Sequence, residues 1–188
     1  MPNKIKRKVK LFFKNGLDSY EYRLLKNKAS LKTYPEHIIF VCKGNIYRSA
    51  FAEHALHRII NNNRLKIDSC GLDVIKKQAS PIKAVASARK FGIDLTNHRS
   101  KPIDNSLIKH ADLILPMEYF QLKELRKKFP EKKESIKLLR SFTPFPYSIL
   151  CNIDDPYGQD EKTINNCFKI IVKSIEELKR IIINLNSI

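Results

Sequence analysis

The sequence predicts an α/β fold in which a four-stranded parallel sheet is covered by helices on both faces. Short apolar runs rich in β-branched residues recur along the chain, and segments with helical spacing of apolar residues lie between them. Strands that alternate with helices form parallel sheets, because each helix returns the chain to the same edge of the sheet. The length of 188 residues suits one such domain.

The strands are expected at residues 37–41, 67–72, 111–117 and 136–142, and the helices at 50–60, 82–91, 118–128 and 162–183. The first run is apolar almost throughout, as is typical of a strand buried on both faces. Gly92 and Pro130 end the second and third helices. The last helix carries a continuous apolar side that we expect to face the sheet.

Residues 1–35 form a basic N-terminal extension to a domain that we expect to span residues 36–188. The extension holds ten of the 36 Lys and Arg residues in less than a fifth of the chain. Its apolar residues are spaced loosely as in an amphipathic helix, which we expect to break at Asn15 and Gly16. The extension either docks on the domain or contacts an anionic membrane or a partner.

Composition argues against several classes of protein. The chain is 43% hydrophobic and 29% charged, which is typical of an ordered domain. No apolar run approaches the roughly 18 to 20 residues of a membrane-spanning helix, and the basic start lacks the apolar segment of a secretory signal. Four scattered cysteines fit neither a zinc site nor a disulfide framework. We therefore expect a cytoplasmic protein, while secretion by a non-classical route stays open.

Residues 42–49, directly after the first strand, read Cys-Lys-Gly-Asn-Ile-Tyr-Arg-Ser. Ligands of parallel sheets bind beyond the carboxyl ends of the strands, so this loop is the candidate site. A loop that turns from a strand into a helix directs backbone N–H groups inward and forms a cradle for a dianion such as phosphate. Gly44 and Asn45 tolerate the left-handed backbone of a tight loop, and Arg48 can bind two phosphoryl oxygens at once.

Cys42 lies at the base of this predicted phosphate-binding loop. The positive field of the loop favours the thiolate, and the Ser49 hydroxyl can donate to the sulfur. A thiolate beside a bound phosphoryl group is an aligned nucleophile. The Cys-x5-Arg spacing is weak by itself, but its place between a buried strand and a helix disfavours the alternative of a buried, inert thiol.

A reaction through a cysteinyl phosphate also needs a proton donor for the leaving group, which then activates water as a base. The segment 152–158 offers Asp154 and Asp155, with Pro156 to stiffen the turn. Tyr157 could line a slot for an aromatic substrate. The alternative is that this segment is only a solvated turn.

From about residue 37 to residue 183 the chain resembles the low-molecular-weight protein tyrosine phosphatases, of the bacterial type. The family's landmarks occur in order: Val41-Cys42-x-Gly44-Asn45-Ile46-x-Arg48-Ser49, Asp68-Ser69-x-Gly71, Gly92-Ile93-Asp94, His98-Arg99-Ser100, Ile136-Lys137-Leu138-Leu139 and Asp155-Pro156-Tyr157-Gly158. By this resemblance Cys42 is the nucleophile, Arg48 binds phosphate and Asp155 is the general acid and then the base. The other implied site residues bind phosphate or substrate, or support the loop: Lys43, Gly44, Asn45, Ile46, Tyr47, Ser49, Tyr157 and, as support, His98.

The resemblance implies a protein tyrosine phosphatase without a metal or organic cofactor. Its partners would be tyrosine-phosphorylated proteins, such as a tyrosine kinase or a host protein, and no specific nucleic acid is expected. Tyr47 stands where the family often has a second Cys. Two alternatives stay open. One is an arsenate reductase-like enzyme, for which Cys70 would have to reach Cys42, and the other is a basic phosphoprotein-binding module that docks through residues 1–35.

Overall fold

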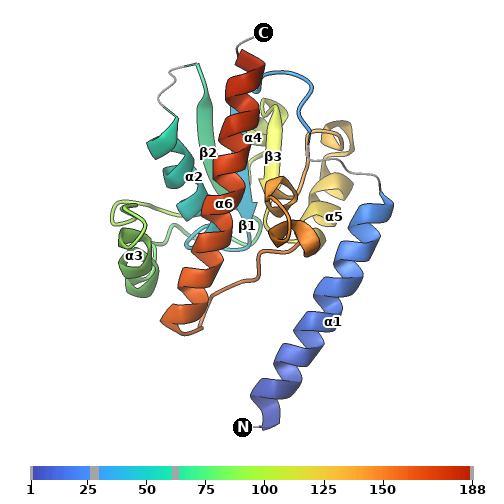
Figure 1. Ribbon diagram of the computed structural model, residues 1–188. Helices are drawn as coiled ribbons and strands as arrows, with labels where there is room; N and C mark the ends of the chain where they lie inside the picture. Colours follow the sequence, from blue (N-terminus) through green and yellow to red (C-terminus); the bar gives the residue numbers. More distant parts are fainter. Residues whose placement is uncertain (1, 26–29, 61–63, 187–188) are drawn as a thin grey trace.

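The computed structural model describes residues 2–25, 30–60 and 64–186 and confirms the α/β fold (Figure 1). Its parallel sheet has three strands in the order β2-β1-β3. The central strand β1 (His37–Cys42) lies between β2 (Lys66–Gly71) and β3 (Leu113–Pro116). All six residues of β1 are buried, as expected of a strand that is covered on both faces.

The prediction of a fourth strand at residues 136–142 is wrong. Ile136 alone forms a parallel bridge, with Ile114 of β3. The chain then leaves the sheet in the 3-10 helix η2 (Leu139–Phe142). Within that turn the Ser141 hydroxyl donates to a carbonyl oxygen three residues earlier, at 2.6 Å. In a continuing strand, this carbonyl oxygen would be available to accept a hydrogen bond from an adjacent strand. The turn occupies it locally, so the strand pairing with β3 does not extend beyond Ile136.

Helices cover both faces of the sheet (Figure 1). The layer on one face consists of α2 (Arg48–Ile59), α3 (Ile82–Arg89) and α6 (Glu161–Asn186). The other face is covered by α4 (Asn105–Lys109) and α5 (Tyr119–Lys128), and α1 (Pro2–Leu24) packs beside α5. Two further 3-10 helices lie in the connections, η1 (Pro130–Lys132) and η3 (Tyr147–Ile149). The fourth strand is absent from the described residues, and α4 was not predicted. The bounds of the three strands and of α2, α3, α5 and α6 agree with the predicted ones within three residues.

Residues of β1 alternate between two hydrophobic cores. Phe40 and Cys42 point into the core beneath α2 and α6, whereas Ile39 and Val41 point into the core beneath α4 and α5. The sheet therefore ends with the Cys42 side chain on the α2 side, at the point where the chain enters the loop before that helix.

Residues 2–24 of the N-terminal extension form one continuous helix, so the predicted break at Asn15 and Gly16 is wrong. A glycine inside a helix costs about 1 kcal/mol relative to alanine, and asparagine is also a weak helix former. Tertiary contacts offset this cost: the Asn15 side chain is buried, and the Tyr22 ring packs edge-on against Tyr119 of α5 at 6.1 Å. The helix therefore lies against the domain beside α5.

None of the helices within the described residues has the length and apolar character that crossing a membrane requires.

Candidate active site

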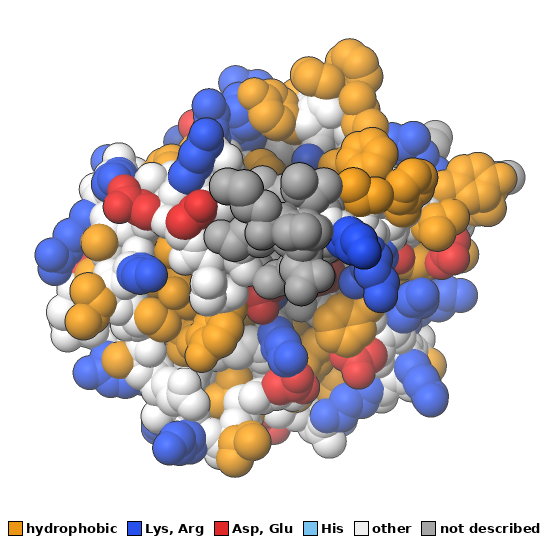
Figure 2. Space-filling model, turned by 90° about the horizontal axis from the view of Figure 1, so that it is seen from below, with side chains coloured by type: hydrophobic (Ala, Val, Ile, Leu, Met, Phe, Trp, Pro, Cys, Tyr) orange, Lys and Arg blue, Asp and Glu red, His pale blue; other side chains and the backbone are white. Residues whose placement is uncertain are grey.

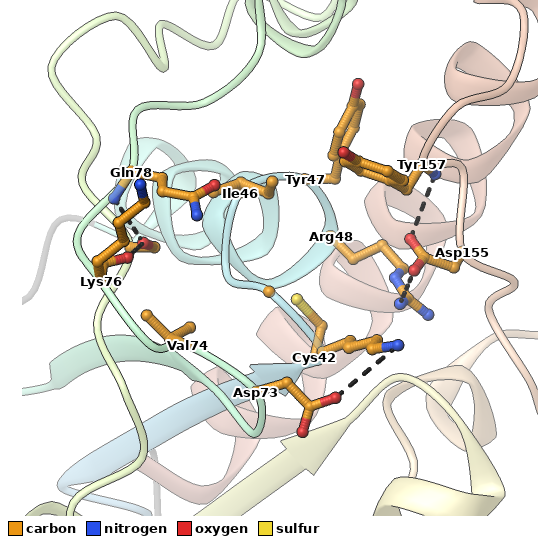
Figure 3. A pocket seen from close by; sticks show the side chains of 13 residues that line it. Cys42, Ile46, Tyr47, Arg48, Asp73, Val74, Lys76, Gln78, Asp155 and Tyr157 are labelled. Atoms are coloured by element: carbon orange, nitrogen blue, oxygen red, sulfur yellow. Dashed lines mark hydrogen bonds and ion pairs between the residues drawn. The ribbon is translucent and has the colours of Figure 1, made fainter.

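A pocket of about 240 Å³ lies at the carboxyl ends of β1 and β2 (Figure 3). It brings together the loop after β1 and the loop before α6, which are more than 100 residues apart in the chain. Eight of the predicted site residues line it: Cys42, Lys43, Gly44, Ile46, Tyr47, Arg48, Asp155 and Tyr157. The remaining three, Asn45, Ser49 and His98, are buried and connected to the same loop by hydrogen bonds.

Asn45 holds the shape of the loop. Its φ of 52° confirms the predicted left-handed backbone, whereas Gly44 does not adopt one. The side-chain Nδ2 donates to the Ser49 hydroxyl at 2.9 Å and to the Ser69 hydroxyl at 2.7 Å. Its Oδ1 accepts from the Lys101 backbone N–H at 2.8 Å. One buried amide thus joins the loop to the start of α2, to β2 and to the segment before α4.

Gly71, at the end of β2, allows the loop to approach the sheet closely. A Cβ atom at this position would lie 2.7 Å from the carbonyl oxygen of Lys43 and 3.0 Å from the backbone nitrogen of Asn45. Both distances are too short for a side-chain carbon, so a larger residue here would displace the loop backbone. This explains physically why glycine stands at this position.

A second layer of polar side chains supports the loop from behind. His98 Nε2 donates to the carbonyl oxygen of Asn45 at 2.8 Å, and burial lowers the pKa of His98, which favours the neutral ring. Glu53 accepts from the Ser69 hydroxyl at 2.5 Å and lies 3.6 Å from Lys101 Nζ. Sequence reasoning missed Glu53, although it follows Ser49 by four residues and so lies on the same side of α2.

Glu53, His54 and His98 form the one group in the described part of the chain with the spacing of a metal site, because their ligand atoms lie within 4.8 Å of one another. Glu53 is already engaged by a hydroxyl and a lysine, and His98 donates to the loop. A positive Lys101 ammonium at 3.6 Å also disfavours a cation. We therefore assign Glu53 and His98 to support of the loop.

The thiol of Cys42 lies at the base of the pocket and is 2% exposed. The Asn45 N–H donates to Sγ at 3.2 Å, and the Ser49 hydroxyl lies 3.0 Å from the same atom. Donors at this distance stabilise a thiolate. Figure 3 shows the sulfur pointing into the loop between β1 and α2.

Arg48 is the most enclosed charge of the site, at 1% exposure. Its NH1 donates to Glu118 at 2.5 Å and to the Ile153 carbonyl at 2.9 Å, and its NH2 lies 3.2 Å from Asp155. Burial opposes the positive charge, but the negative groups Cys42, Asp155 and Glu118 outweigh it, so the pKa of Arg48 is raised. The buried Nε has no hydrogen-bond partner among the described residues. An unpaired donor in the wall of this pocket suits a phosphoryl oxygen.

Glu118 is a site residue that the sequence reasoning did not identify. It directly precedes α5, where its side chain and that of Gln121 form a capping box, and its carboxylate also holds Arg48. The sequence did contain an indication of this role. Glu118 follows β3 by two residues, and side chains just beyond the carboxyl ends of parallel strands lie at the same edge of the sheet, where ligands bind.

The structure separates the two adjacent carboxylates. Asp155 lines the pocket, with Oδ2 at 3.2 Å from Arg48 and Oδ1 at 3.3 Å from the backbone N–H of Tyr157. Asp154 instead accepts hydrogen bonds on both oxygens from Asn15 of α1, at 3.0 and 3.1 Å. Asp155 is therefore the carboxylate that is placed to exchange a proton in the pocket.

Two aromatic rings flank the mouth of the pocket. Tyr47 and Tyr157 lie edge to face, with centroids 6.3 Å apart and ring planes at 85° (Figure 3). Tyr47 is buried and Tyr157 is two-thirds exposed. At the rim, Lys43 lies 3.8 Å from Asp73. The mouth thus offers ring surfaces to a flat, apolar group above the phosphate-binding loop.

Cys70 is poorly placed to form a bond with Cys42. In the parallel register Val41 lies opposite Cys70, whereas Cys42 lies opposite Gly71. Cys70 accordingly points into the core on the α5 side and Cys42 into the core on the α2 side. A disulfide relay through Cys70, as the arsenate reductase-like alternative requires, would need one strand to rotate.

We predict that mild alkylation modifies Cys42 alone. Burial raises the pKa of Cys70 and of Cys167 to about 12 and that of Cys151 to about 11, so these three remain protonated and unreactive at neutral pH. Iodoacetamide treatment of the folded protein at pH 7, followed by peptide mass spectrometry, should locate one carbamidomethyl group at Cys42. The Cys42→Ser variant should stay unlabelled, and labelling of a second cysteine in the folded protein would contradict the prediction.

Comparisons with known proteins agree with this geometry. The family model of the low molecular weight phosphotyrosine protein phosphatases matches residues 37–186. The low molecular weight protein-tyrosine-phosphatase Wzb of Escherichia coli K12 is 29% identical over 140 residues, which cover 74% of this chain and 90% of Wzb. The phosphatase Ptp of Acinetobacter johnsonii is 33% identical over 126 residues, or 67% of this chain and 83% of Ptp.

Solved structures show the same fold. Tyrosine phosphatase Wzb of Escherichia coli K30, in complex with sulphate, superposes with a TM-score of 0.70 at 25% identity and covers 78% of this chain and 97% of its own. The arginine phosphatase YwlE of Geobacillus stearothermophilus superposes with a TM-score of 0.71 at 24% identity, over 81% and 94% of the two chains. With the family model matched from the first residue of β1 to the last residue of α6, this chain belongs to the low molecular weight protein-tyrosine-phosphatase family.

Proposed function

We propose that this chain hydrolyses phosphotyrosine in proteins in two steps, through a phosphate ester on the sulfur of Cys42. The observation that carries the proposal is the environment of Cys42 and Arg48. A thiol with two close donors lies in the same pocket as a buried guanidinium whose Nε has no partner among the described residues. The two groups suit the attacking atom and the anion-binding group of phosphoryl transfer.

In the first step, the phosphoryl oxygens bind to Arg48 and to backbone N–H groups of the loop. The Cys42 thiolate attacks phosphorus, an S–P bond forms and the P–O bond to the tyrosine ring breaks. Asp155 donates its proton to the departing phenolic oxygen, so the leaving group departs as a neutral phenol. Arg48 compensates the negative charge that the equatorial oxygens carry in the transition state.

In the second step, the Asp155 carboxylate takes a proton from a water molecule, whose oxygen attacks phosphorus. The S–P bond breaks, and inorganic phosphate and the Cys42 thiolate result. The Ser49 hydroxyl and the Asn45 N–H stabilise the sulfur as it leaves, because both lie near Sγ in the resting structure. Asp155 ends the cycle protonated, ready for the next leaving group.

The aromatic mouth supports aryl phosphates as the substrate class. Tyr47 and Tyr157 provide apolar ring surface on one side of the pocket, and Ile46 and Val74 also line it. A phosphotyrosine ring that reaches the loop can contact these side chains. We propose tyrosine-phosphorylated proteins as the partners; whether the target is a tyrosine kinase or a host protein stays a prediction, as does the cytoplasmic location.

For the extension, we propose contact with an anionic membrane surface through the outer side of α1. Phe13, Leu17, Tyr20 and Leu24 follow one another at helical spacing and are each between 63% and 65% exposed. Figure 2 views the molecule from below relative to Figure 1, and it shows hydrophobic side chains gathered at the upper right, beside Lys and Arg side chains. Exposed Lys6, Lys10 and Lys14 on the same helix supply the positive charge that attracts anionic lipid.

The membrane contact is tested by co-sedimentation with vesicles. Vesicles that contain phosphatidylserine should retain the protein at low salt, phosphatidylcholine vesicles should not, and Leu17→Glu should abolish retention. Equal behaviour with both lipids, or a concentration-dependent dimer that buries this side of the helix, would contradict it.

We predict that Cys42→Ser lowers kcat for p-nitrophenyl phosphate by at least about a thousandfold, since the hydroxyl is not ionised at neutral pH. The matched control is Cys70→Ala, which removes a thiol that points into the other core and should retain activity. Full turnover by Cys42→Ser would remove the proposed mechanism, and loss of turnover in the control would favour the relay through Cys70. Tight binding of a phosphotyrosine peptide without turnover by the wild type would instead indicate the phosphoprotein-binding module.

We also predict that Asp155→Asn lowers kcat/KM for phosphotyrosine by about a hundredfold or more, because the amide cannot donate the proton that the phenoxide needs. Asp154→Asn should lose much less activity, since its Oδ1 can still accept from Asn15. Steady-state kinetics on both variants checks the assignment. Equal losses would mean that neither carboxylate acts in the way proposed.

A further inference from the structure

The loop that carries Asp155 is held from two sides. Residues 151–158 have no regular secondary structure. On the sheet side, the Ile153 N–H donates at 2.8 Å to the carbonyl of the residue after β3, and the Tyr119 N–H donates to Oδ1 of Asn152 at 2.7 Å. On the other side the loop contacts α1, which precedes the segment that matches the family model.

The contacts from α1 are made by buried polar side chains. Asn15 Nδ2 donates to both oxygens of Asp154, and Asn15 Oδ1 accepts from Nδ2 of Asn152 at 2.8 Å. The same Nδ2 of Asn152 donates to Asp18 at 2.7 Å. Asn15 is 4% exposed and Asn152 is 1% exposed. Hydrogen bonds in such surroundings are strong, and each lost partner leaves a buried polar group unsatisfied.

Two further bonds extend this attachment along α1. The Cys151 N–H donates to the buried Ser19 hydroxyl at 2.9 Å, and Arg23 donates to the carbonyl of Ile149 at 2.7 Å. Along this stretch α1 buries Asn15 and Ser19 against the loop, while Leu17 and Tyr20 are exposed. The attachment therefore rests on directional bonds, which fix an orientation more narrowly than apolar contact does.

We propose that Asn15 is a positioning residue for the general acid and acts through Asp154. Asp154 and Asp155 are consecutive, so a fixed Asp154 carboxylate limits the rotation of the backbone that carries Asp155. The Asp155 carboxylate lies 3.2 Å from Arg48, and a displacement of about 1 Å is enough to slow a reaction strongly. This role of Asn15 rests on the proposed role of Asp155 as the acid.

The test compares two substrates that need the acid to different degrees. Phenoxide is a poor leaving group that requires protonation, whereas nitrophenoxide departs with little help. A misplaced acid therefore lowers kcat/KM for phenyl phosphate more than for p-nitrophenyl phosphate. A general loss of folded protein lowers both by the same factor, so the ratio of the two values isolates the acid.

Four variants complete the design. Asn15→Ala removes the donor, and Asn15→Asp places two carboxylates face to face. The double variant Asn15→Asp with Asp154→Asn exchanges donor and acceptor across the same contact. Gly16→Ala is the matched control on α1, since Gly16 is exposed and an added Cβ meets no atom within 4 Å beyond the adjoining helix. Thermal unfolding, followed by circular dichroism, reports the stability of each variant.

We expect Asn15→Ala and Asn15→Asp to lower kcat/KM for phenyl phosphate about tenfold and that for p-nitrophenyl phosphate clearly less. The double variant should recover most of the loss, and Gly16→Ala should match the wild type. An unchanged ratio in both Asn15 variants would overturn the positioning role. If the single variants unfold, the double variant decides: a folded protein with wild-type ratio supports the role, and one with a lowered ratio overturns it. A wild type inactive on both substrates would instead overturn the proposed function.

Discussion

A single buried positive charge organises the active site of this chain. The Arg48 guanidinium is almost fully enclosed, and removal of such a charge from water costs several kcal/mol unless it is paired. Glu118 and Asp155 supply the pairing, and Cys42 adds a third negative group when it is ionised. These groups come from the loop after β1, the start of α5 and the loop before α6. Each of these segments must reach its native position for the charge to be compensated, so the pocket and the fold depend on the same interaction.

The site could be predicted from the sequence where its signal is local. Cys42 and Arg48 belong to one strand–loop–helix unit, and the physical requirements of a phosphate cradle can be recognised within eight consecutive residues. Asp155 lies far away in the chain, and physical reasoning gave only a pair of adjacent carboxylates. The family resemblance selected Asp155, which lies in the pocket beside Arg48, whereas Asp154 contacts Asn15. Glu118 and Glu53 act through neighbours that only the tertiary structure brings together. Even so, Glu118 lies just beyond the carboxyl end of a strand, and Glu53 lies one helical turn after Ser49, and both positions indicate proximity to the site.

The two errors in secondary structure have different causes. Residues 136–142 have the apolar character of a strand, yet a serine hydroxyl and a tight turn satisfy their backbone locally, and one bridge remains. Asn15 and Gly16 have the composition of a break, yet Asn15 is buried in hydrogen bonds to another part of the chain and the helix continues. A local turn thus replaced the expected strand, whereas contacts with a distant segment preserved a helix that local propensity disfavours.

Helix α1 carries polar side chains that hold the loop of Asp155 and, on its other side, exposed apolar residues. Because α1 and this loop are joined by hydrogen bonds, they move together. A surface that binds the apolar side of α1 more tightly in one position of the helix therefore also favours the corresponding position of the loop. Thermodynamic linkage makes such a coupling reciprocal: if the outer side of α1 binds a surface in this way, a phosphorylated ligand that stabilises the loop changes the affinity of that binding by the same factor. An element outside the matched family segment can thereby give a small phosphatase an allosteric input.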